Sequence, residues 1–123
     1  MNRRDAERRG RGAESLACWY LRLKGWRILA RRARVPGGEV DIVARRRKTL
    51  AFVEVKARAT EESAAFALDE WRLRRVVTAA ERLAQRYMRA GDDVRIDALF
   101  IVPRRWPRHL PNVWQGDSMQ RRY

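Results

Sequence analysis

The chain has very few of the residues that build redox and metal sites. It contains one cysteine, Cys18, and one histidine, His109. A single cysteine excludes an internal disulfide, and a lone histidine between two prolines is a poor metal ligand or general base. The sequence also has no CxxC pair, no glycine-rich phosphate loop and no internal repeat.

Long apolar segments are missing as well. No run approaches the roughly 18 residues that a transmembrane helix needs. The basic start, MNRRDAERRGRG, is not followed by the apolar region of a secretory signal. We therefore expect no membrane partner and a cytoplasmic protein. The 46% of hydrophobic residues suffices for a core, and we expect a single domain over residues 12–115, between a basic flexible tail (1–11) and a C-terminal tail (116–123).

Negative charge is scarce. The chain carries 15 acidic and 29 basic residues, which gives a formal net charge of +14. A domain this basic attracts polyanions, so we expect a nucleic-acid partner, with DNA favoured over RNA. Most of the basic residues are arginines, as a GC-rich genome would also favour. Codon bias does not explain their excess over Asp and Glu.

Hydrophobic periodicity predicts an α/β fold with the element order αβββαβ. Helical spacing of apolar residues predicts helices over residues 13–24 and 69–89, each followed by a capping glycine, Gly25 or Gly91. The predicted strands cover residues 26–34, 39–44, 49–57 and 94–102, with a short edge strand around 109–114. We expect a central mixed sheet flanked by helices.

The two best strand candidates, EVDIVA and TLAFVEVKA, carry charged residues among apolar ones. A short basic link joins them, so they are expected to form an antiparallel hairpin with its turn between Arg47 and Lys48. This register puts Asp41 opposite Glu54, with Cβ atoms about 4.5–5.5 Å apart. Two facing carboxylates supply hard oxygen ligands for Mg²⁺ or Mn²⁺. Lys56 shares a face with Glu54 and would position a water or stabilise a phosphate.

Structural interpretations of these charged residues remain open beside the catalytic one. E-x-K is a short pattern, and a ladder of ion pairs on a strand would produce it too. Glu14 lies in the first turn of the predicted helix, where a carboxylate favours the helix dipole. Asp97 is expected to pair with a neighbouring arginine, and Cys18 to pack in the core.

The combination of GEVDIVA and LAFVEVKAR, with GAESLACWYL before and HLPNVW after, resembles the YraN family of small bacterial proteins. That family has a restriction-endonuclease-like fold and no firmly assigned function. The resemblance implies a PD-(D/E)xK-type site in which Asp41 and Glu54 bind metal and Lys56 is catalytic. The chain is also similar to archaeal Holliday-junction resolvases, where a glutamate of the first helix joins the site. This similarity makes Glu14 a fourth catalytic candidate and a homodimer the expected assembly.

The function predicted from the sequence is a magnesium-dependent endonuclease that cleaves DNA phosphodiester bonds. Its predicted nucleic-acid contacts are Arg45, Arg46, Arg47, Lys48, Arg58 and Arg72. Two alternatives remain. One is a non-catalytic nucleic-acid-binding protein with a nuclease-like fold, and the other is an interaction partner within a DNA-processing assembly.

Overall fold

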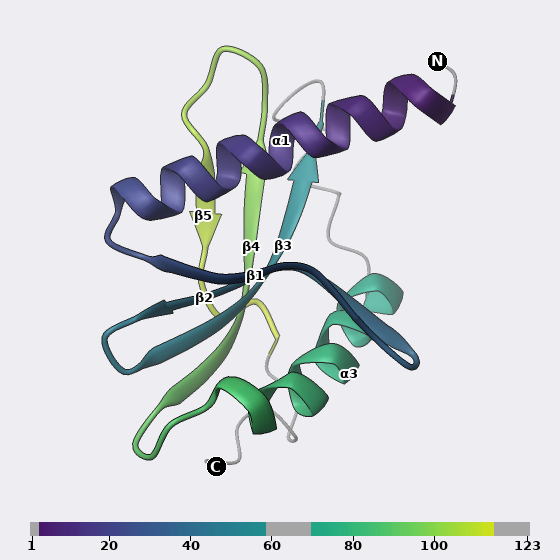
Figure 1. Ribbon diagram of the computed structural model, residues 1–123. Coiled ribbons are helices and arrows are strands. Elements are labelled where there is room, and N and C mark those ends of the chain that lie inside the picture. Colours follow the sequence, from purple (N-terminus) through teal and green to yellow (C-terminus); the bar gives the residue numbers. More distant parts are fainter. Residues whose placement is uncertain (1–2, 59–69, 115–123) are drawn as a thin grey trace.

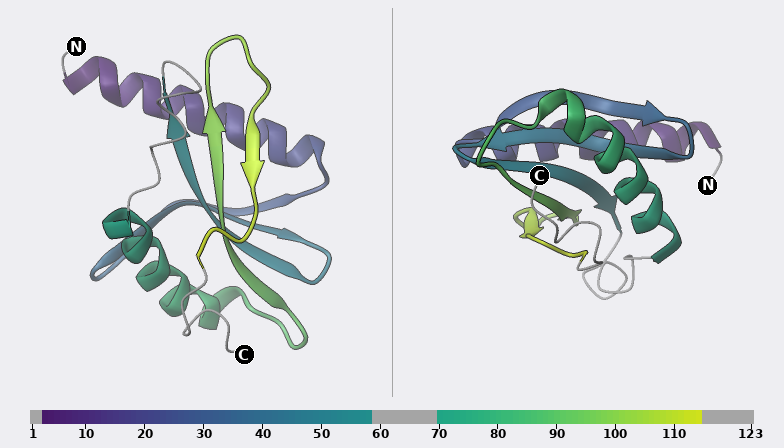
Figure 2. Two further views of the ribbon diagram at one scale, coloured as in Figure 1. Left: turned by 180° about the vertical axis from the view of Figure 1, so that it is seen from behind. Right: turned by 90° about the horizontal axis from the view of Figure 1, so that it is seen from below.

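The computed structural model describes residues 3–58 and 70–114, which form a five-stranded mixed sheet with a helix on each face (Figures 1 and 2). The elements are α1 (Arg3–Leu23), β1 (Arg27–Val35), β2 (Gly38–Arg46), β3 (Thr49–Ala57), α3 (Glu70–Tyr87), β4 (Asp93–Ile101) and β5 (Arg108–Leu110). The strands lie in chain order across the sheet, and only β3 and β4 are parallel neighbours. The predicted fold class is confirmed. No helix in the described part of the chain is long and apolar enough to cross a membrane.

Helix α1 begins ten residues earlier than predicted, at Arg3 rather than at residue 13. It therefore runs through most of the segment that the sequence assigned to a flexible tail; residues 1 and 2 lie outside the described part. Glu14 is consequently in the middle of α1, and its interpretation as a first-turn residue was wrong. The predicted C-cap is confirmed. The Trp26 N–H donates to the Leu21 carbonyl at 2.9 Å, and Gly25 has a φ of 91°, as a Schellman motif requires.

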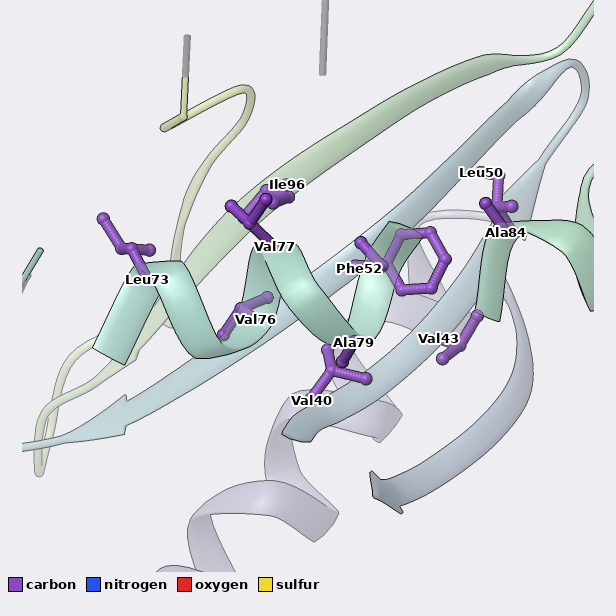
Figure 3. Close-up of a cluster of buried hydrophobic side chains, with 11 residues drawn as sticks. Val40, Val43, Leu50, Phe52, Leu73, Val76, Val77, Ala79, Ala84 and Ile96 are labelled. Carbon is purple, nitrogen blue, oxygen red and sulfur yellow. The ribbon is translucent and has the colours of Figure 1, made fainter. Parts of the chain in front are cut away.

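Each helix covers its own hydrophobic core. On the α1 side, Ala17, Cys18 and Leu21 pack against residues of β2, β3 and β4. On the α3 side, the buried residues include Leu73, Val76, Val77, Ala79, Ala80 and Ala84 of the helix and Val40, Phe52 and Ile96 of the sheet (Figure 3). Cys18 is the packing residue that we expected, and burial raises the pKa of its thiol.

The β1–β2 hairpin touches α3 backbone to backbone. Gly38 permits this approach, because a Cβ atom there would lie 2.5 Å from the Arg75 carbonyl oxygen and 2.8 Å from the Ala79 nitrogen. Figure 1 shows the hairpin reaching over α3. The contact holds the first half of α3 close to Asp41, which follows Gly38 by three residues on β2.

Arg45 is a structural residue, which corrects its prediction as a nucleic-acid contact. Its guanidinium is buried and donates to both carboxylate oxygens of Asp92, at 2.9 and 2.6 Å, and to the Tyr87 carbonyl at 2.9 Å. The hydrogen bonds from Arg45 hold the pKa of the Asp92 carboxyl below its ordinary value. This pair ties β2 to the chain that leaves α3, and both terminal nitrogens of Arg45 are engaged within the protein.

Asp97 behaves as its structural interpretation predicted. It is fully buried on β4 and pairs with Arg95 at 2.9 Å, while the His109 Nε2 lies 2.8 Å away and the Asn112 N–H donates at 2.9 Å. Burial alone raises the pKa of Asp97, but the hydrogen bonds from His109, Arg95 and Asn112 outweigh it and keep the pKa below its ordinary value. The network fastens β5 and the segment after it to β4.

We predict that Asp92→Ala lowers the free energy of unfolding by about 3 kcal/mol, because it leaves the buried Arg45 charge without its partner. Urea denaturation measures the change. The matched control is Glu70→Ala, which breaks the exposed Arg74–Glu70 pair at 3.1 Å and is expected to cost less than about 0.5 kcal/mol. Equal effects of the two substitutions would contradict the structural role of Arg45.

Candidate active site

The site forms where strands β2 and β3 part. Their ladder runs from the Arg46–Thr49 pair to the Ile42–Val53 pair and ends there. This is the register predicted from the sequence, so the next residues, Asp41 and Glu54, would face each other. Beyond the last pair, the Val55 N–H donates to the Asp41 carboxylate at 2.7 Å. A side chain thus replaces the backbone acceptor that a continued ladder would provide.

Asp41 and Glu54 form a closely spaced pair of carboxyl groups. Burial and then the negative charge of Glu54 raise the pKa of Asp41 from 3.8 to about 7, although the Val55 hydrogen bond acts in the opposite direction. The Asp41 carboxyl therefore retains its proton to a much higher pH than an ordinary aspartate does. A cation bound between the two carboxyl groups would oppose this rise in pKa, because it stabilises the ionised form of both groups.

Lys56 completes the buried cluster. Its Nζ lies 2.9 Å from the Oε1 of Glu54, and both side chains are less than a tenth exposed. The two residues are neighbours on one face of β3, as the alternation of a strand dictates. Arg72 of α3 approaches the same Oε1 to 3.9 Å from a half-exposed position. Glu54 thus has two cationic neighbours, whereas Asp41 relies on a backbone N–H.

Glu14 approaches the pair from helix α1. Its carboxylate is buried and accepts hydrogen bonds from the Nε of Arg31 at 3.2 Å and the Nε of Arg32 at 3.1 Å. Its negative charge contributes to the raised pKa of Asp41, which places the two carboxylates within electrostatic reach. The structure therefore brings all four predicted catalytic residues into one region. The hydrogen bonds of Glu14 are directed to β1.

A cleft of about 390 Å³ opens beside the carboxylates. Its walls are formed by Glu39, Asp41 and Glu54 from the strands and by Trp71, Arg72, Arg75 and Val76 from α3. The sequence prediction missed Trp71 and Arg75. The Arg75 guanidinium lies 5.5 Å from the centre of the Trp71 ring. The spacing of Trp71 and Arg75, one helical turn, predicts that they share a face of the helix. The sequence does not show that this face of α3 lies against the carboxylates.

The predicted basic turn is far from the cleft. Glu54 follows Lys48 by six positions along the chain, which is roughly 20 Å at about 3.3 Å per residue in a strand. Arg46 lies over the Trp26 ring at 4.7 Å, and Arg58 donates to the Ala57 carbonyl at 2.7 Å. Among the six predicted contacts, only Arg72 borders the carboxylates.

The carboxylates fit a hard divalent cation in part. The residues described here contain no group of three or more His, Cys, Asp or Glu side chains arranged to hold a metal. Mg²⁺ needs only one or two carboxylates when waters and phosphate oxygens fill its remaining positions. The pair formed by Asp41 and Glu54 is such a donor set.

Comparison with known proteins places the chain in a family. The sequence profile of the uncharacterised protein family UPF0102 matches residues 13–101. The chain belongs to this family. A UPF0102 protein of Sphingopyxis alaskensis is 57% identical over 115 residues, covering 94% of this chain and 99% of that protein. Another, from Rhizorhabdus wittichii, is 55% identical over 117 residues, with the same coverage of both chains. The resemblance to YraN is confirmed.

We predict that Asp41 makes stability depend on pH. Because folding raises its pKa from 3.8 to about 7, Asp41 stabilises the fold below pH 4, and this contribution is lost as the pH rises through 7. Asp41→Asn cannot ionise, so its stability relative to the wild type should increase between pH 4 and pH 8. Urea denaturation across this range measures the difference. The control Glu39→Gln, at a half-exposed carboxylate, should show no such trend. A constant difference for Asp41→Asn would contradict the raised pKa.

Proposed function

We propose that this protein is a metal-dependent endonuclease that cleaves DNA through a PD-(D/E)xK-type site. The observation that carries the proposal is the pair formed by the partly buried Asp41 and the buried Glu54, held where the strands part, with the buried Lys56 beside it. Such a pair costs stability at neutral pH, and strongly shifted pKa values are typical of functional sites. The family resemblance supports the same assignment. The proposal includes DNA rather than RNA as substrate, a homodimer and a cytoplasmic location.

Asp41 and Glu54 are the residues that would hold Mg²⁺ or Mn²⁺. The metal would neutralise phosphate oxygens and lower the pKa of a bound water. The Val55 N–H fixes the orientation of the Asp41 carboxylate. Lys56 stays within 2.9 Å of Glu54, so its ammonium is placed to donate to a water or to a phosphate oxygen beside that carboxylate. Glu14 adds negative charge that favours a cation in the cleft.

The arginines of α3 supply the contacts to the substrate backbone. Arg72 and Arg75 line the cleft beside the carboxylates, at a spacing that leaves both on one side of the helix. Arginine binds phosphate oxygens in a bidentate manner and retains its charge at every relevant pH. These contacts would hold a phosphodiester over the carboxylates, and affinity from them should fall with rising salt.

A second candidate is a nucleic-acid-binding protein without catalysis. It is favoured by the state of Glu54, which Lys56 and Arg72 already neutralise without a metal. In that case the cluster is a buried ion pair, the structural interpretation left open by the sequence. The two candidates differ in whether a divalent cation is required.

We predict that Asp41→Asn and Lys56→Ala each reduce magnesium-dependent cleavage at least about 100-fold, the cost of losing one electrostatic group at such a site. A screen of branched, nicked and single-stranded DNA and of RNA identifies the substrate, and its cleavage rate is then compared among variants. Asp41→Asn is the sharper variant, because it removes charge repulsion and should fold at least as well as the wild type at pH 7.

Glu39→Gln is the matched control, since Glu39 lines the same cleft but pairs with Arg34 at 3.6 Å on the surface. It should retain cleavage. Binding measured in EDTA should persist in every variant. If the wild type cleaves none of these substrates with Mg²⁺ or Mn²⁺ but still binds them, the non-catalytic candidate is correct.

A further inference from the structure

Helix α1 exposes large apolar side chains on its outer face. Leu16, Trp19 and Leu23 are 40%, 49% and 60% exposed, and their spacing puts them on neighbouring turns of the helix. The inner face of α1 is already buried against the sheet through Ala17, Cys18 and Leu21. The residues on the outer face therefore do not contribute to the core, and a cluster of exposed apolar side chains this large indicates a binding surface.

The connection between β4 and β5 adds a second tryptophan to this surface. Trp106 is 72% exposed, and its ring lies nearly parallel to that of Trp19, with 6.4 Å between centroids and 9° between planes. Figures 1 and 2 show this connection extending past the end of the sheet near α1. Two segments about ninety residues apart in sequence thus present stacked indoles to the solvent.

A hollow of about 610 Å³ lies between α1 and the start of the β4–β5 connection. Its walls include Ala13 and Leu16 of α1, Ile101 at the end of β4, and Pro103 and Arg104 after that strand. Arg58, at the end of β3, also lines it. Leu16 is one turn from Trp19 on α1, and Arg104 is two residues from Trp106, so the same two segments form the hollow and carry the indoles. The surface combines apolar walls, aromatic faces and guanidinium groups.

The two segments that carry the indoles, residues 12–24 and 102–114, are mainly basic. Residues 12–24 contain a single carboxylate, Glu14, which is buried and paired with Arg31 and Arg32. Residues 102–114 contain no Asp or Glu, but three arginines. An acidic partner is therefore complementary, whereas a second copy of this chain would add its own net charge of +14.

We propose that this surface binds unpaired bases of single-stranded nucleic acid. One base stacks on the exposed indole of Trp106, its neighbour enters the hollow, and Arg58 and Arg104 contact the phosphates between them. Aromatic platforms with a basic border bind single strands in this way. An anionic membrane would also attract tryptophan, leucine and arginine, but a planar lipid surface leaves the hollow unfilled and makes no use of parallel rings.

Helix α1 carries Trp19 of the proposed surface and also Glu14, whose charge acts on Asp41. Trp19 and Glu14 are five residues apart, a rise of about 7.5 Å along the helix. A strand bound at the indoles could therefore continue to the cleft, and the substrate of the proposed nuclease would include an unpaired segment. The base-binding surface itself does not depend on catalysis, because none of its residues belongs to the Asp41–Glu54 pair.

The test compares a labelled oligothymidylate with an abasic oligomer of the same length, by fluorescence anisotropy in EDTA at one salt concentration. The wild type should bind the oligothymidylate about tenfold more tightly, since each stacked base contributes on this scale. Trp106→Ala should lose this preference while it keeps the affinity for the abasic oligomer. Trp106→Phe, which retains an aromatic face, should keep most of the preference.

Leu23→Ala is the matched control, because Leu23 lies on α1 outside both the hollow and the indole stack to which base binding is assigned. The substitution removes exposed apolar area without an aromatic ring and should keep the preference. A base preference that survives Trp106→Ala would overturn the proposal. So would binding to phosphatidylglycerol vesicles that both Trp106→Ala and Leu23→Ala abolish, or a dimer in sedimentation that both dissociate. A chain that shows the predicted base preference but never cleaves DNA would overturn the proposed nuclease function alone.

Discussion

The hydrogen bond from the Val55 N–H to the Asp41 carboxylate is the interaction on which the site depends. It lies where the β2–β3 ladder ends, and it holds a carboxylate in the gap that the separating strands leave. The surrounding residues make a negative charge at this position energetically unfavourable. Glu54 is adjacent, α1 brings Glu14 close, and α3 is held nearby because Gly38 lets it approach the hairpin.

Two carboxylates in this protein, the buried Asp92 and the partly buried Asp41, have pKa values shifted in opposite directions. Asp92 receives a bidentate arginine and a backbone N–H, and its pKa is lowered. Asp41 receives one N–H and two acidic neighbours, and its pKa is raised to about 7. The first arrangement stabilises the fold. The second arrangement lowers the stability of the fold, and a bound cation would offset this loss. We therefore assign a functional role to Asp41 and a structural role to Asp92.

The sequence predicts the strands, their register and the facing of Asp41 and Glu54, because alternating side chains and a short turn leave few other pairings. It does not predict that Arg45 is buried, since its partner Asp92 lies 47 residues away. Nor does local pattern show that α1 starts at Arg3, where polar residues give no apolar periodicity. The stacking of Trp19 on Trp106 likewise depends on tertiary structure. The sequence therefore does not predict the proposed base-binding surface.

The central claim is that Asp41 and Glu54 form one cation site, and titration calorimetry tests it most directly. Mg²⁺ or Mn²⁺ is titrated into the protein at pH 7 in two buffers of different ionisation enthalpy, which reveals protons released on binding. Because the pKa of Asp41 is raised to about 7, binding of one ion should release protons from this carboxyl, and Asp41→Asn should abolish the release. No binding, or binding without proton release, would contradict the claim.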